Sequence, residues 1–186
     1  KEYQVTCARG SDAWMHAVSI SDADTSKTTT ETINGVSVTT VKGKVTDQTK
    51  ENLLYLSTDG GLMEIVIDGG TDASNGKVLM PGRELTVSFY RGSDAYQHAS
   101  RIVAEKESTS PANVNTSSTV TVTGTVDGKS NENMLYLKTS GGMMELKLDV
   151  LSSLNNCKVL VRGKQVSVSC AYGSDAYMHA VSITAL

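Results

Sequence analysis

Serine, aspartate and histidine recur together at a fixed spacing in this chain, within the motif Gly-Ser-Asp-Ala-aromatic-x-His-Ala. The motif occurs at 10–17, 92–99 and 173–180. Its copies hold the three histidines of the chain, His16, His98 and His179. These residue types could form the triad of a hydrolase, but one short hairpin would have to supply all three members. No loop that could form an oxyanion hole is evident, so we expect no catalytic residue and no enzyme.

A metal site is the second chemistry that the motif could support. Each copy offers one Asp and, four residues later, one His. Two ligands are too few for a structural metal site. We therefore expect no metal and no cofactor. An Asp in a turn readily accepts backbone N–H groups, so the simplest interpretation is a structural motif in which the histidine fixes a hairpin.

Ligand binding is the third possibility, because carbohydrate sites combine an aromatic platform with a few polar groups. Two sets of residues fit this description. The motif contributes Trp14, Tyr96, Tyr177, Asp12, Asp94 and Asp175. A neighbouring hairpin contributes Tyr55 and Glu64 and, in a second copy, Tyr136 and Glu145. The tyrosine–glutamate pairs also have an ordinary interpretation as cross-strand neighbours on an outer face.

These residues belong to a longer repeat. Segment 41–45 matches 122–126, and segment 60–64 matches 141–145, always 81 residues apart. The third copy is partial, because 1–20 matches only 164–183. Self-similarity at a constant offset indicates repeated modules.

The repeat predicts five regions. They are a partial repeat that forms the terminal hairpin of a module (1–20), a linker (21–36), a first β-module (37–105), a linker (106–118) and a second β-module (119–186). The linkers are predicted from their Ser/Thr-rich composition. The partial repeat lacks a front half, for which three explanations are open. The chain is a piece of a longer array, another chain or the edge of a neighbouring module completes the hairpin, or the folding unit is permuted and begins with this segment.

Within one module, alternating apolar residues predict strands at 36–45, 53–57 and 62–68, followed by 83–91 and 95–103. A loop of four residues at 58–61 joins the second and third strands. Opposite Tyr55 we expect Glu64, with Leu54 and Ile65 facing the core. Gly43 suggests a bend in the first strand. The connector before the fourth strand allows a short helical turn in the second copy, at 150–154.

The last strand of each module alternates as aromatic, His, variable and Ile. Strict alternation places the histidine on the same face as the aromatic residue and the isoleucine. We therefore expect the histidine to point toward the core.

The order of three strands, a connector and two strands resembles the oligonucleotide/oligosaccharide-binding (OB) barrel. It is similar in particular to OB-fold-like modules of bacterial exported and cell-surface proteins. The resemblance is carried by Gly43, Gly124, Leu79-x-x-Gly82 and Leu160-x-x-Gly163. It implies an all-β protein of tandem five-stranded barrels; a small β-sandwich is the structural alternative.

Composition restricts the partners. The net charge is −3 with both signs interspersed, from which we expect no nucleic-acid partner. No apolar run reaches the roughly 18 residues that cross a bilayer, so we expect no membrane insertion. The sequence predicts a non-catalytic module of an extracellular or bacterial surface protein that binds a glycan or mediates adhesion. The alternative is a spacer or assembly module that associates with another protein or with itself through residues 1–20.

Overall fold

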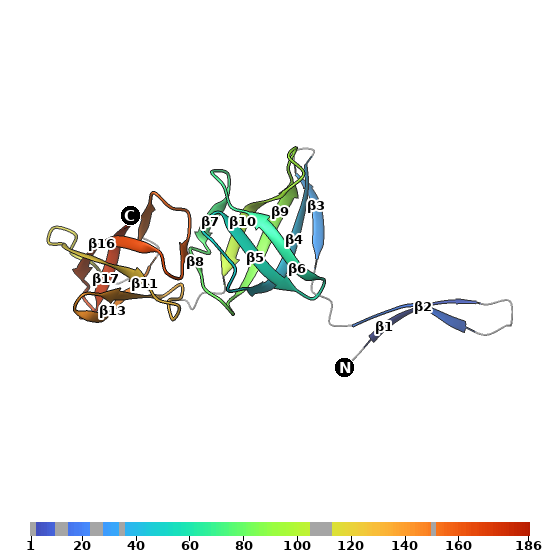
Figure 1. The fold of residues 1–186 in the computed structure, drawn as a ribbon, viewed down its shortest axis with the longest axis horizontal. Coiled ribbons are helices and arrows are strands. Elements are labelled where there is room, and N and C mark those ends of the chain that lie inside the picture. The colour runs from blue at the N-terminus through green and yellow to red at the C-terminus, as the bar shows by residue number, and fades with distance from the viewer. Residues whose placement is uncertain (1–2, 10–14, 23–27, 34–35, 105–112, 150–151) are drawn as a thin grey trace.

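A computed structural model describes residues 3–9, 15–22, 28–33, 36–104, 113–149 and 152–186, and the side chains of these residues from Thr28 onward except Ile33. All regular elements in this part of the chain are strands (Figure 1). None of the described residues forms a helix that is long and apolar enough to cross a bilayer.

The first repeat forms a closed barrel. Its strands are β4 (Val36–Val45), β5 (Leu53–Thr58), β6 (Gly61–Val66), β9 (Glu84–Arg91) and β10 (Gln97–Ala104). β4 pairs antiparallel with β5 and β9, β5 pairs with β6, and β9 pairs with β10. A parallel bridge between β6 and β10 closes the ring. The first strand therefore contacts the second and fourth, and the third contacts the fifth, as in an OB barrel.

The second repeat forms the same ring. Its strands are β11 (Val120–Val126), β12 (Met134–Thr139), β13 (Gly142–Lys147), β16 (Gln165–Tyr172) and β17 (Met178–Ala185). β11 pairs with β12 and β16, and β13 closes onto β17 in parallel. The prediction of tandem OB-like barrels is confirmed, and the β-sandwich alternative is wrong.

The hairpin of β5 and β6 shows how alternation fills the core. Leu54 and Ile65 are fully buried and lie opposite each other, and Tyr55 lies opposite Glu64, as predicted. The loop is shorter than expected, because pairing continues to Thr58 and Gly61 and leaves a turn of two residues. Gly61 has a φ of 112°, which glycine adopts without strain.

Gly43 marks the point where β4 changes partner. β4 pairs with β9 along most of its length and reaches β5 only from Lys44 onward. A Cβ atom at Gly43 would lie 2.7 Å from the carbonyl oxygen of Ser57, closer than real Cβ contacts. The glycine therefore allows the strand to bend between two neighbours, as a strand glycine at a barrel corner does.

The connectors differ from expectation. β7 (Asp72–Asn75) and β14 (Ser153–Asn155) are short strands that pair in parallel with β10 and β17. The helical turn expected at 150–154 is therefore wrong for Ser153 and Leu154, because their backbone groups bond to the open edge of β17; 150–151 lie outside the described residues. β3 (Thr29–Ile33), in the segment expected to be a linker, pairs antiparallel with β4.

A β-bulge recurs in the last hairpin of every copy. Phe89 pairs with Ala99 and Ser88 with Arg101, so Ser100 has no partner in the ladder. Val181 is skipped in the same way between β16 and β17. β1 (Tyr3–Arg9) and β2 (Met15–Asp22) form a separate two-stranded sheet in which Val18 is skipped. The partial copy therefore has the backbone register of a complete terminal hairpin.

A two-stranded parallel sheet joins the barrels. It consists of β8 (Val78–Leu79) and β15 (Leu160–Val161), with Val78 opposite Leu160 and Leu79 opposite Val161. One face of this sheet, with Val78, Met80 and Leu160, belongs to the second core. The other face, with Leu79, Val159 and Val161, packs into the first core. Each module therefore supplies side chains to the core of its neighbour.

Polar contacts reinforce this seam. The Glu132 carboxylate accepts the backbone N–H groups of Lys77 (3.3 Å) and Val78 (2.8 Å). The ammonium of Lys77 donates to the carbonyl oxygen of Ser152, and Lys164 forms an ion pair with Glu51. The seam combines reciprocal apolar burial with satisfied backbone groups, so we expect the barrels to behave as one unit.

The exchange of side chains predicts a crossed effect on stability. Val159→Ala removes two buried methyl groups from the first core and should cost about 2 kcal/mol. Hydrogen exchange should therefore accelerate in β5 and β10, although Val159 lies in the second repeat. Val168→Ala, an equally buried control within the second core, should accelerate exchange in β11 and β16 first. An effect of Val159→Ala confined to the second barrel would contradict the packing of Val159 into the first core.

Candidate functional site

The histidine motif lies at the end of each barrel, and the bulge decides which way its side chains point. Ala99 and Ile102 are both buried in the core, although they are three positions apart. They share a face because Ser100 is the extra residue of the bulge. His98 and Tyr96 therefore lie on the opposite face from Ile102. The expectation that the histidine and the aromatic residue share the core face with the isoleucine is wrong, although His179 is itself buried behind that face.

His98 is held between two carboxylates. Its Nδ1 lies 2.7 Å from Oδ2 of Asp68, in the turn after β6, and its Nε2 lies 3.0 Å from Asp94 in the hairpin turn. The imidazole also stacks on Tyr90 with a centroid separation of 5.6 Å. The side chain of His98 is 15% exposed. We call the histidine with its two aspartates the clamp, because it fixes two turns to the last strand.

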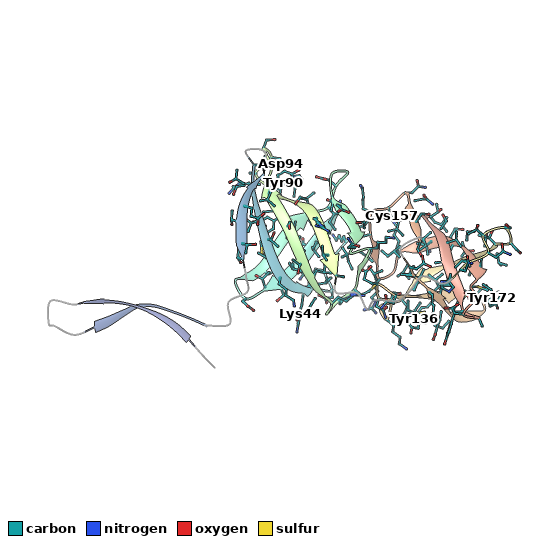
Figure 2. All side chains as sticks on the ribbon, turned by 180° about the vertical axis from the view of Figure 1, so that it is seen from behind. Lys44, Tyr90, Asp94, Tyr136, Cys157 and Tyr172 are labelled. Atoms are coloured by element: carbon teal, nitrogen blue, oxygen red, sulfur yellow. The ribbon has the colours of Figure 1, made fainter. Side chains whose placement is uncertain are left out.

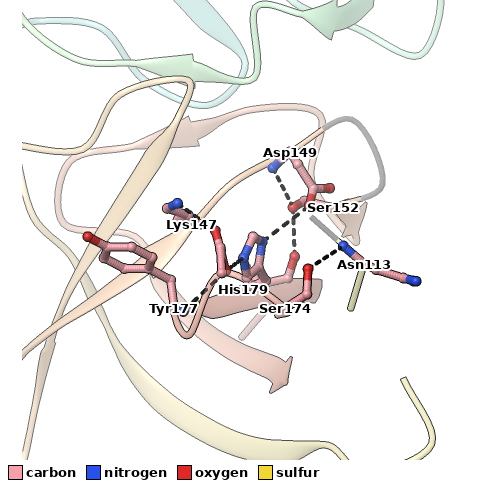
Figure 3. A network of polar contacts seen from close by, with 9 residues as sticks. Asn113, Lys147, Asp149, Ser152, Ser174, Tyr177 and His179 are labelled. Carbon is pink, nitrogen blue, oxygen red and sulfur yellow. Dashed lines mark hydrogen bonds and ion pairs between the residues drawn. The ribbon is translucent and has the colours of Figure 1, made fainter. Parts of the chain in front are cut away.

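The second barrel has the same clamp (Figure 3). His179 Nε2 lies 3.0 Å from Asp175 Oδ1, and Nδ1 lies 3.4 Å from Asp149 Oδ2. The Ser152 hydroxyl accepts the Asp149 N–H and donates to the carbonyl oxygen of Ala180. Thr71 makes the equivalent bonds in the first barrel. The turn that holds the distant aspartate is therefore itself tied to the last strand.

The remaining motif residues have conformational roles. A Cβ atom at Gly92 would lie 2.7 Å from the His98 ring, and one at Gly173 would lie 2.6 Å from His179. Only glycine leaves room for the imidazole at these positions. The alanines that follow the aspartates, Ala95 and Ala176, have left-handed φ values of 70° and 64°. This backbone turns the next residue, the tyrosine, away from the barrel.

The clamp perturbs the protonation of its members. Hydrogen bonds to Asp68 and then Asp94 raise the pKa of His98. The same bonds from His98 lower the pKa of Asp68 and of Asp94. In the second barrel the pKa of Asp175 is strongly lowered, first by Lys147 and then by His179. The charged forms of both partners are thus favoured around His98.

An exposed tyrosine stands at each hairpin tip. Tyr96 is 60% exposed and Tyr177 is 57% exposed. Figure 2 shows Asp94 at one end of the first barrel. In the second barrel the ammonium of Lys147 lies 3.9 Å from the centre of the Tyr177 ring. The tip, defined as the aspartate and tyrosine of the motif, therefore combines an aromatic face with a carboxylate.

The other sequence-predicted ligand residues lie elsewhere. Tyr55 and Tyr136 are half-buried on the outer sheet face, opposite the exposed Glu64 and Glu145. In each hairpin the tyrosine and the glutamate are cross-strand neighbours on one face, as the ordinary interpretation of these pairs predicts. Trp14 and Asp12 lie outside the described residues, as does the side chain of His16.

The geometry at His98 does not form a hydrolase triad. Both ring nitrogens are bonded to carboxylates, so neither is free to take a proton from Ser93. In the second copy the Ser174 hydroxyl instead accepts the N–H of Asn113. The described residues also hold no group of three or more His, Cys, Asp or Glu side chains arranged to bind a metal ion.

A cleft of about 480 Å³ opens at the seam. Its walls come from both modules and include Lys77, Lys158, Ser74 and Ser153. Cys157 also lines it, and burial raises the pKa of this thiol. None of the described residues that line the cleft is aromatic.

Sequence reasoning missed three functional neighbours of the motif. Asp68 and Asp149 complete the clamps from 30 residues upstream. Both aspartates occupy the same position in the two repeats, so the alignment of the repeats could have indicated that they share a role. Lys147 was also missed; its signal was a difference between the repeats, because Val66 occupies the matching position.

No family model and no curated protein sequence matches the chain. Among solved structures, Drosophila Unr CSD456 is 13% identical, with a TM-score of 0.25, over 99% of this chain and 76% of that one. A multidomain protein with nucleic acid binding domains from Streptococcus pneumoniae TIGR4 is 12% identical, with a TM-score of 0.25, over 76% of this chain and 44% of that one. The chain is an all-β protein of OB-like barrels.

One expectation about partners is corrected by these matches. The exclusion of nucleic acid rested on the net charge and on the interspersed signs of the sequence. Because a matched structure is described as having nucleic acid binding domains, that exclusion was wrong. The physical reason is that net charge is a sum over the whole chain and does not define the local surface of one barrel.

The clamp predicts a pH dependence of stability. The raised pKa of His98 gives a contribution that is complete below the unfolded value of about 6.5 and is lost as pH rises through the folded value. The lowered pKa values of Asp68 and Asp94 give a contribution that is lost only when pH falls through their folded values. The urea midpoint of the wild type should therefore exceed that of His98→Gln more at about pH 6 than at about pH 9. An equal difference at both pH values would contradict this role.

Proposed function

We propose that this chain is a non-catalytic binding protein of the bacterial surface or extracellular space, in which two coupled barrels present tyrosine-bearing tips to a glycan. The observation that carries the proposal is the exposure of Tyr96 and Tyr177, which are 60% and 57% exposed at equivalent tips. A tyrosine ring offers an apolar face for a sugar ring, and the adjacent carboxylate accepts hydroxyl hydrogen bonds.

The scaffold supports this role. The clamp fixes the turn that carries each tyrosine, so binding costs little ordering of the protein. The seam fixes one barrel to the other through reciprocal core packing. Two exposed tyrosine rings on one body therefore offer two aromatic faces to a glycan.

Removal of the tyrosine rings tests the proposal. On an array of glycans, Tyr96→Ala combined with Tyr177→Ala should weaken retention roughly tenfold or more, because the aromatic platform is lost. Tyr172→Ala is the matched control, since Tyr172 is 66% exposed but lies outside the tips. The same array should carry single-stranded oligonucleotides. Retention of oligonucleotides and of no glycan would contradict the proposal.

A second candidate function, assembly, is favoured by the N-terminal hairpin. β1 and β2 have the register and the bulge of a complete terminal hairpin, but among the described strands they pair only with each other, in a separate sheet. In a barrel, this hairpin pairs with a first strand and closes onto a third. Another module or another chain could supply those strands by β-strand addition.

The oligomeric state in solution distinguishes an assembly module from a monomeric binding protein. If the hairpin pairs with another copy, the full chain should form concentration-dependent oligomers. Deletion of 1–22 should leave a monomer of unchanged stability, because the barrels are complete without these residues. Analytical ultracentrifugation of both forms is the measurement. Identical monomers at all concentrations would remove self-assembly through this hairpin.

A further inference from the structure

The two tips are built alike up to the tyrosine. The N–H groups of Tyr96 and Tyr177 each donate to the motif aspartate at 3.1 Å. The same aspartates each lie 3.0 Å from the Nε2 atom of the clamp histidine. Together with the left-handed alanines, these bonds give the two turns the same backbone conformation up to the tyrosine.

One neighbouring position differs between the barrels. Lys147, at the end of β13, pairs with His179 across the parallel bridge, and Val66, at the end of β6, pairs with His98 in the same way. The two residues therefore occupy equivalent places beside their tips. One carries an ammonium on a long stem, and the other is a short apolar side chain.

Lys147 shows what the tip can bind. Its ammonium donates to Asp175 Oδ2 at 2.6 Å and lies 3.9 Å from the centre of the Tyr177 ring. Carboxylate and ring thus hold one cation together, through a charge-assisted hydrogen bond and a cation–π contact. In the first barrel the Asp94 carboxylate is bonded by His98 and by the Tyr96 N–H.

Exposure reflects this difference. The Asp175 side chain is 30% exposed, whereas that of Asp94 is 51% exposed. The first tip therefore offers to solvent a carboxylate that the second tip uses on its own lysine. Tyr96, two residues after Asp94, is 60% exposed.

From this contrast we propose that the tip formed by Asp94 and Tyr96 binds an external primary ammonium group, and that Lys147 occupies the equivalent site of the second barrel from within. The inference rests on the proposed glycan function and specifies its ligand as an amino sugar whose nitrogen is not acetylated. The ammonium would take the place that the Lys147 ammonium has in the second tip, and the sugar ring would lie against Tyr96. Acetylation removes the positive charge and therefore the interaction with both groups.

Reciprocal exchange of the two residues tests the proposal in the full chain. The probes are an oligomer of β-1,4-linked glucosamine and the same oligomer fully N-acetylated, titrated by calorimetry below the pKa of the sugar amine. The wild type should bind the free-amine oligomer at one tip, roughly tenfold or more tighter than the acetylated form. Val66→Lys should abolish this preference, because the new lysine fills the site. Val66→Met, of similar length but uncharged, should retain it.

The second tip provides the converse. Lys147→Val should open it and raise the stoichiometry from one site to two, while Asp94→Asn should abolish the site of the first barrel. Circular dichroism confirms that each variant is folded.

Distinct results overturn distinct statements. Equal affinity for the two oligomers would overturn the ammonium site and leave glycan binding intact. Failure to bind either oligomer would also overturn the ammonium site, while the glycan array decides the proposed function separately. Unchanged binding by Val66→Lys would place the site elsewhere. A lysine-rich peptide is titrated as a third probe. Preference for this peptide over both oligomers would show that the ligand of the ammonium site is a protein, and would contradict the proposed amino-sugar ligand.

Discussion

A single extra residue in the last strand sets the surface chemistry of each barrel. Because Ser100 and Val181 have no partner in the ladder, the alternation reverses between the isoleucine and the histidine. Ala99, before the bulge, and Ile102, after it, both face the core. The histidine and the tyrosine lie on the opposite face of the strand. Without the bulge, the imidazole would be buried in an apolar core, where its desolvation would be costly. The clamp and the tip both depend on this reversal.

The clamp explains why the motif is longer than a turn requires. The histidine bonds one aspartate of its own hairpin and one from the turn after the third strand, so it connects segments that are 30 residues apart. Glycine leaves room for the ring and alanine adopts the left-handed turn. The geometry thus accounts for the glycine, the aspartate, the first alanine and the histidine of the motif. What the geometry leaves exposed is the tyrosine, and this is why the proposed function is centred there.

Much of the fold could be predicted from local pattern. Alternation in the β5–β6 hairpin gave the register of Tyr55 and Glu64, and the repeat gave two equivalent barrels. The direction of His98 could not be predicted, because a bulge changes the period by one residue without a clear signal in a strand of mixed polarity. The Asp68 partner was also missed, since a hydrogen bond between distant turns depends on barrel closure. The seam was missed because Val78 and Val159 look like ordinary core residues of their own modules. Each of them instead packs into the core of the other module.

Duplication explains how the tips could diverge while the scaffold stayed the same. The clamp and the seam restrict most motif positions, since they fill space or satisfy buried polar groups. Positions 66 and 147 lie beside the tips, partly exposed at strand ends, and are free of those restrictions. A change from valine to lysine there alters only what meets the carboxylate and the ring. The two barrels can therefore share one architecture and still differ in whether a lysine of the same chain or an external ammonium group meets the carboxylate of the tip.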